Sequence, residues 1–146
     1  MKGLRWIALL ALATACATGE YRSEPADQPA TPREIGAHEL TVVDEGAQGG
    51  LADAFAQALA QQGFRVVNHP PFHGELEVTL ATQASPQGPV AVAVLTSDGF
   101  FVDEARAHLD RGDAAAAWLA KTLAISERMA EFIRNSGTVD QTNFAK

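Results

Sequence analysis

The dipeptide Asp98-Gly99 lies between two apolar runs, one over residues 90–96 and one that begins at Phe100. Asp-Gly accepts the left-handed backbone of a two-residue turn, so in this position it predicts a β-hairpin. An isolated hairpin is at best marginally stable in water, and one of its faces must be covered by other elements. The chain is therefore expected to form a sheet with a covered face around this hairpin.

The register of the hairpin is open to two interpretations. A two-residue turn pairs Val94 with Asp103 on the face that carries alternate valines. A one-residue bulge instead places Val102 and Glu104 on that face. Both registers put an acidic residue near the edge of the core. We expect a hairpin that projects beyond the core, and we do not take this acidic residue as a buried functional carboxylate.

Two helices and further strands can cover the sheet. Large apolar residues recur every four positions over residues 51–59, and Gly63 follows as a helix cap. A longer helix with a broad apolar stripe is expected from Asp113 to a stop at Ser136-Gly137.

Alternating or β-branched residues predict strands at 40–43, 64–67 and 75–82 as well as in the hairpin. The element order is β-α-β-β-β-β-α, or β-α-β-β-β-α if residues 64–67 and 75–82 form one strand bent at Pro70-Pro71. We expect the α+β class, with two helices packed on one face of a small mixed sheet of four to five strands.

The N-terminus has the form of a secretory signal peptide over residues 1–15, with Lys2 and Arg5 before an apolar run too short to span a bilayer. Residues 12–16, LATAC, resemble the lipobox of bacterial lipoproteins, in which cleavage occurs before a cysteine that carries a lipid. Cys16 is the only cysteine of the chain, which fits this resemblance. Ordinary export with a free Cys16 is the alternative, because Ala13-Thr14-Ala15 also fits the small-residue rule for cleavage.

A chain of 146 residues has room for one domain after such a leader. Residues 17–38 carry three prolines among polar residues and no regular periodicity. We therefore expect a lipidated Cys16 and Pro-rich tether over residues 16–38, a single domain over 39–137 and a flexible tail over 138–146.

The charge balance argues against several partners. Removal of residues 1–15 takes away two basic residues and no acid, which leaves 9 basic and 18 acidic residues and a net charge of −9. Such a chain repels nucleic acid and anionic head groups. We expect no nucleic-acid partner, and membrane attachment only through the lipid on Cys16.

No motif points to catalysis, a cofactor or a metal. His69 and His73 flank Pro70-Pro71, which excludes the helix on which two histidines four positions apart could share a metal ion. Ser97 precedes Asp98, and His108 is the nearest histidine that follows, but the sequence has no nucleophile elbow around the serine. The prediction is a non-catalytic protein without a cofactor or a metal.

Aromatic residues are the remaining candidates for a binding site. Phe100 and Phe101 at the hairpin tip are the aromatic pair most expected to be exposed, and exposed aromatic side chains are typical of partner-binding surfaces. One interpretation is that one of the two rings points into the core while its neighbour shields the turn; the other, which we carry forward as the candidate site, is that both residues contact a partner. The alternative is a small apolar ligand in a cleft between helices and sheet, near Trp118 and Phe55.

Together, Cys16, the Pro-rich segment, the helix LADAFAQALAQQGF, the strand ELEVTLAT and the closing helix resemble small bacterial envelope lipoproteins. These include the lipopolysaccharide-assembly lipoprotein of the outer membrane, transport-auxiliary lipoproteins and the amino-terminal domain of the Tol-system propeller protein. The resemblance implies two helices on a mixed sheet and a role as a binding or assembly subunit. The residue after Cys16 is Ala17, not the aspartate that resembles an inner-membrane retention signal, so the expected location is the outer membrane, facing the periplasm.

Overall fold

The computed structural model describes residues 24–47, 49–111 and 113–144. Five strands form one mixed sheet in the order β2-β1-β3-β4-β5. The strands are β1 (Glu39–Asp44), β2 (Arg65–Val67), β3 (Leu76–Gln83), β4 (Val90–Ser97) and β5 (Phe100–His108). The described helices are α2 (Pro32–Ile35), α3 (Leu51–Gln61), α4 (Asp113–Ile125) and α5 (Glu127–Phe144), with a 3-10 turn at Leu109–Arg111. The predicted α+β class is confirmed.

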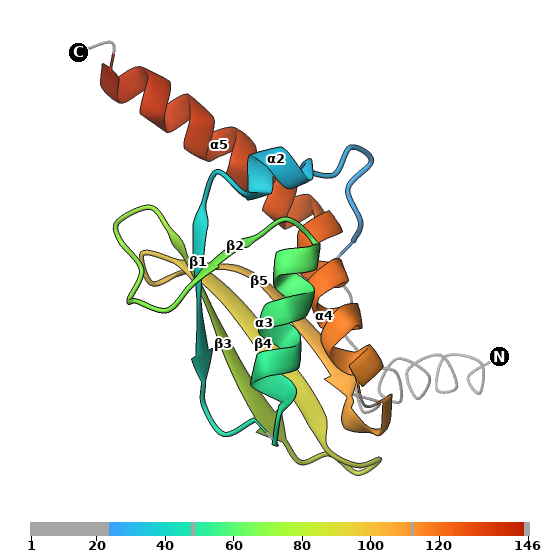
Figure 1. The fold of residues 1–146 in the computed structure, drawn as a ribbon. Coiled ribbons are helices and arrows are strands. Elements are labelled where there is room, and N and C mark those ends of the chain that lie inside the picture. The colour runs from blue at the N-terminus through green and yellow to red at the C-terminus, as the bar shows by residue number, and fades with distance from the viewer. Residues whose placement is uncertain (1–23, 48, 112, 145–146) are drawn as a thin grey trace, which may run out of the picture.

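The core lies between the sheet and helices α3 and α4, which run side by side over one face of it (Figure 1). Alternate residues of the strands and one stripe of each helix are fully buried there: Leu40, Phe55, Leu59, Leu76, Val78, Leu80, Leu95, Leu119 and Leu123. Burial of each large apolar side chain contributes about 1.5–3 kcal/mol. This layer holds the sheet rigid and so fixes where its end loops lie.

Strands β2 and β3 pair with β1 on opposite sides, both in parallel, with Val66 and Leu76 each opposite Leu40. The two strands are therefore separate, and the alternative of one bent strand is wrong. The intervening residues 68–75 have to cross β1, and the Thr41 hydroxyl donates a hydrogen bond of 2.6 Å to the carbonyl oxygen of His69. This crossing carries residues 68–75 to the start of β3, beside the β4–β5 hairpin (Figure 1).

The hairpin turns at Asp98 and Gly99, whose φ angles are +54° and +79°. A bulge lies between Leu95 and Thr96, so that Val94 faces Glu104, which is the second of the two predicted registers. The hairpin does not project wholly beyond the core, since Asp103 is fully buried opposite Leu95. The reason is that Leu95, not the valines, faces the helices.

The helix expected from Asp113 to Ser136-Gly137 is two helices, α4 and α5, which separate at Ser126. The buried Ser126 hydroxyl accepts a hydrogen bond from the backbone N–H of Met129 (3.0 Å) and so caps α5. Helix α5 continues to Phe144, past the predicted stop and into the segment expected to be a flexible tail.

The segment expected to be a tether belongs in part to the domain. The backbone of Glu24 and Ala26 bonds that of Glu127 and Ile125 at the break between α4 and α5. Residues 32–35 form helix α2, which buries Ile35. Among the described residues, attachment to the domain therefore begins at Glu24, not at residue 39.

Candidate functional site

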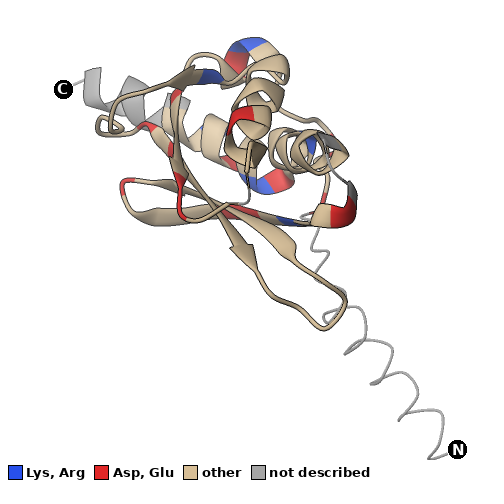
Figure 2. Ribbon diagram, turned by 60° about the horizontal axis from the view of Figure 1, so that its bottom comes forward, with Lys and Arg blue, Asp and Glu red and all other residues tan. Residues whose placement is uncertain are grey.

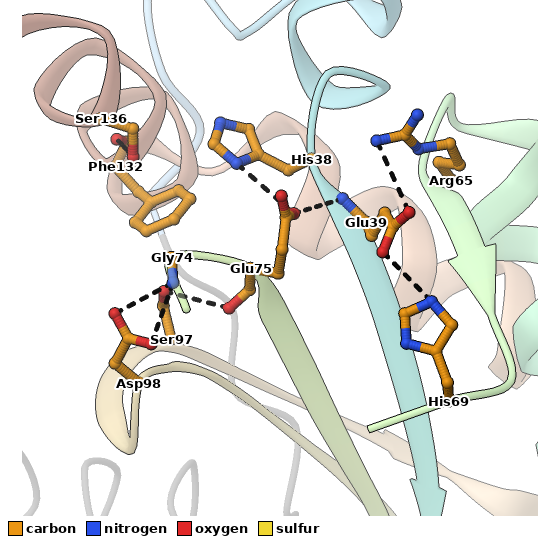
Figure 3. A network of polar contacts seen from close by, with 10 residues as sticks. All are labelled: His38, Glu39, Arg65, His69, Gly74, Glu75, Ser97, Asp98, Phe132 and Ser136. Carbon is orange, nitrogen blue, oxygen red and sulfur yellow. Dashed lines mark hydrogen bonds and ion pairs between the residues drawn. The ribbon is translucent and has the colours of Figure 1, made fainter. Parts of the chain in front are cut away.

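Two loops meet at the end of the sheet where β4 ends and β3 and β5 begin: residues 68–75 and the β4–β5 hairpin (Figure 1). The Asp98 carboxylate accepts hydrogen bonds from the backbone N–H of Gly74, at 2.9 Å and 3.2 Å to its two oxygens. The Ser97 hydroxyl donates to the carbonyl oxygen of Glu75 (3.1 Å), as Figure 3 shows. These bonds hold the two loops together.

Three phenylalanines on these loops are exposed: Phe72 (67% exposed), Phe100 (77%) and Phe101 (53%). We call these three residues the aromatic tip. The exposure expected for Phe100 and Phe101 is confirmed. Phe72 was missed as a site residue, although its position between Pro70-Pro71 and Gly74, outside any periodic pattern, could have marked it as a loop aromatic.

Helix α5 contributes a cation to the aromatic tip. The guanidinium carbon of Arg128 lies 5.4 Å from the centre of the Phe101 ring, within the range of a cation–π contact. One turn later, the Phe132 ring lies 5.4 Å from the ring of His38. The first two turns of α5 therefore border the tip. The sequence of residues 127–135 predicts a helix but does not indicate which loop that helix contacts.

Behind the tip lies a network of imidazole and carboxylate groups (Figure 3). The Glu75 carboxylate accepts a hydrogen bond from the backbone N–H of Glu39 and lies 3.8 Å from the His38 ring nitrogen. The Glu39 carboxylate in turn lies 3.3 Å from His69 Nε2 and 3.9 Å from the Arg65 guanidinium. This network ties β1, β2 and β3 together at the base of the two loops.

His69 and His73 serve different carboxylates. His73 Nδ1 lies 3.2 Å from Asp98 and its side chain is 96% exposed, whereas His69 faces Glu39. In the part of the chain that the structure describes, no three His, Cys, Asp or Glu residues are grouped in a way that could hold a metal ion.

The structure also separates the residues considered for nucleophilic chemistry. Ser97 pairs with Phe100 at the start of β5, whereas His108 is the last residue of that strand and pairs with Val90. A serine and a histidine at opposite ends of the paired strands β4 and β5 cannot share a proton. The nearest polar partner of the Ser97 hydroxyl is instead the backbone of Glu75.

Two residues named for the ligand alternative belong to the core. Phe55 is fully buried, and Trp118 is half-buried against the same cluster.

Acidic residues are spread over the helices and strands, while the hairpin between β3 and β4, at the far end of the sheet from the aromatic tip, carries no charge (Figure 2). Cys16 lies outside the described residues. No helix within the described ranges is long and apolar enough to cross a membrane.

Comparison with known proteins returned neither a matching family model nor a similar curated protein.

Proposed function

We propose that the protein is a lipid-anchored, periplasm-facing accessory subunit of the bacterial envelope, held in the outer membrane through Cys16. Its role is to bind another envelope protein, in assembly or transport, without catalysis. The leader over residues 1–15 and the cysteine that follows it support the address. The aromatic tip supports the binding role.

The observation that carries the proposal is the exposure of three phenylalanines on two loops that are bonded to each other. Exposed aromatic side chains held in place lose little conformational freedom when a partner covers them, and aromatic residues are enriched at the centres of interfaces. A surface with a small number of such anchors fits a protein partner, because a small fraction of interface residues supplies most of the binding free energy.

Site-specific photo-crosslinking in intact cells tests the proposal. A benzoylphenylalanine replaces Phe100, and the matched control carries it at the exposed Gln87 in the β3–β4 hairpin at the far end of the sheet. We expect one abundant adduct with a single envelope protein from position 100 and none from position 87. Sparse adducts of many masses from both positions would contradict the proposed binding role.

A further inference from the structure

The chain that leads from Cys16 joins the domain beside the aromatic tip. The carbonyl oxygen of Glu24 accepts a hydrogen bond from the backbone N–H of Glu127 (3.0 Å), at the first residue of α5. The next residue is Arg128, whose guanidinium lies over the Phe101 ring. The point of attachment and the tip are thus connected through two consecutive residues of one helix.

The connection between Cys16 and this point is short. Residues 17–23 are seven residues, and even a fully extended chain advances no more than about 3.6 Å per residue. Glu24 therefore cannot lie further than about 30 Å from Cys16. If Cys16 carries the lipid, the start of α5 stays within about 30 Å of the bilayer surface, so the aromatic tip can reach the part of a partner that lies at that surface.

Arg128 gives the tip a positive charge that can be shared with a partner. Arg65 and Arg106 lie beside Glu39 and Glu104 at 3.9 Å and 2.9 Å, whereas no ion pair between described residues involves Arg128. The side chain of Arg128 is exposed. A guanidinium that stacks on a ring keeps its N–H donors available, and a carboxylate is the group that matches their geometry.

We infer that the partner is a membrane-embedded protein that presents an apolar side chain beside a carboxylate to the aromatic tip, at the bilayer surface. This inference rests on the proposed function. The phenylalanines receive the apolar group and Arg128 receives the carboxylate. A lipid surface fits less well, because the exported chain carries a net charge of −9 and Asp98 lies at the tip.

The test measures the yield of the adduct from benzoylphenylalanine at position 100 in full-length variants. Arg128→Gln is expected to lower the yield about tenfold, the size of loss found for the few residues, often arginines, that dominate an interface. Arg128→Lys, which keeps the charge but not the forked donors, is expected to lose less. Arg33→Gln removes an exposed arginine of α2 that makes no cation–π contact among the described residues, and it is the matched control, with no change expected.

The short connection is tested by an insertion of twenty Gly and Ser residues between Glu20 and Tyr21. This increases the segment from seven to twenty-seven residues, which lowers the effective concentration at a nearby site roughly eightfold under a −3/2 power law. A comparable fall in adduct yield is expected.

Each part of the inference can fail while the proposed function stands. Equal yields for Arg128→Gln and Arg33→Gln would overturn the carboxylate, and an unchanged yield after the insertion would overturn the location at the bilayer. An adduct whose mass is that of a phospholipid would replace the protein partner by the lipid surface. If the protein whose only change is benzoylphenylalanine at position 100 gave no adduct, the proposed function itself would be refuted.

Discussion

At position 63, both the backbone conformation and the close packing of a neighbouring helix require glycine. Its φ is +109°, and an added Cβ would lie 2.8 Å from the Cα and Cβ of Pro32 in helix α2. A side chain there would both strain the backbone and push α2 away from the domain. The segment that contains α2 has no regular sequence pattern of its own. The packing of α2 on the domain thus depends on Gly63 having a hydrogen atom where any other residue has a Cβ.

We predict that Gly63→Ala lowers the free energy of unfolding by about 2–4 kcal/mol, from backbone strain plus the clash. Gly88→Ala is the matched control, since its φ is +110° and an added Cβ meets nothing within 4 Å. Gly88→Ala should lower the free energy of unfolding only by the backbone strain, about 1–2 kcal/mol. Urea denaturation measures both, and equal losses would show that Pro32 does not pack on Gly63.

Two phenylalanines provide a second contrast between single residues. Phe55→Ala removes a fully buried ring and is expected to cost about 3–5 kcal/mol of stability. Phe100→Ser changes a side chain that is 77% exposed and should alter stability by less than about 0.5 kcal/mol. Thermal or urea unfolding of the two variants checks this, and a large loss for Phe100→Ser would mean that this ring belongs to the core.

Among the elements, the division of the last helix into α4 and α5 has the largest consequence for the site. A serine in an apolar periodic stretch is compatible with a continuous helix, so residues 113–135 predicted one. The structure uses Ser126 as a cap instead, because the backbone of residues 24–26 bonds Ile125 and Glu127 at this point. Helix α5 begins directly after this break, and its second residue, Arg128, contacts the Phe101 ring.

Ser126→Ala is therefore expected to lower the free energy of unfolding by about 1–2 kcal/mol, as the loss of a buried helix cap does. The control is Ser136→Ala, whose hydroxyl donates a hydrogen bond to the carbonyl oxygen of Phe132 inside α5 and caps nothing. Its substitution should have little effect or a slightly favourable one. Similar losses in the two variants, measured by chemical denaturation, would contradict the capping role of Ser126.

At the scale of the whole molecule, the short segment between Cys16 and Glu24 and the attachment of Glu24 to α5 determine how far the domain can be from a membrane. A lipid on Cys16 is the premise. We predict that Cys16→Ala moves the exported protein from the membrane fraction to the soluble periplasmic fraction. Several acyl chains anchor a protein durably, and nothing in the charge of this chain could replace them.

Fractionation of cells followed by immunodetection measures the shift, and Thr18→Ala in the same segment is the control that should stay with the membranes. A Cys16→Ala variant that still sediments with the membranes would overturn the lipid anchor. It would leave the fold and the exposure of the aromatic tip as described.

The sequence by itself determined the features that depend on neighbouring residues. Asp98-Gly99 specified the hairpin, four-residue spacing specified α3, and alternation specified β3, because each is encoded within a few positions. The exposure of Phe100 and Phe101 also followed locally, from their place directly after a turn. These local signals were sufficient for the fold class and for two of the three residues of the aromatic tip.

Only the tertiary structure decided which face of β4 is covered. Both faces of this strand carry apolar residues, valines on one face and Ala91, Ala93 and Leu95 on the other. The alternation in the sequence therefore could not predict which face the helices cover. Pairing with Leu76, Val78 and Leu80 of β3 made the choice and buried Asp103 as a result. The same reason applies to the site: Arg128 meets Phe101, and the loop that carries Phe72 bonds the hairpin, because strand pairing and helix packing bring distant segments to one end of the sheet.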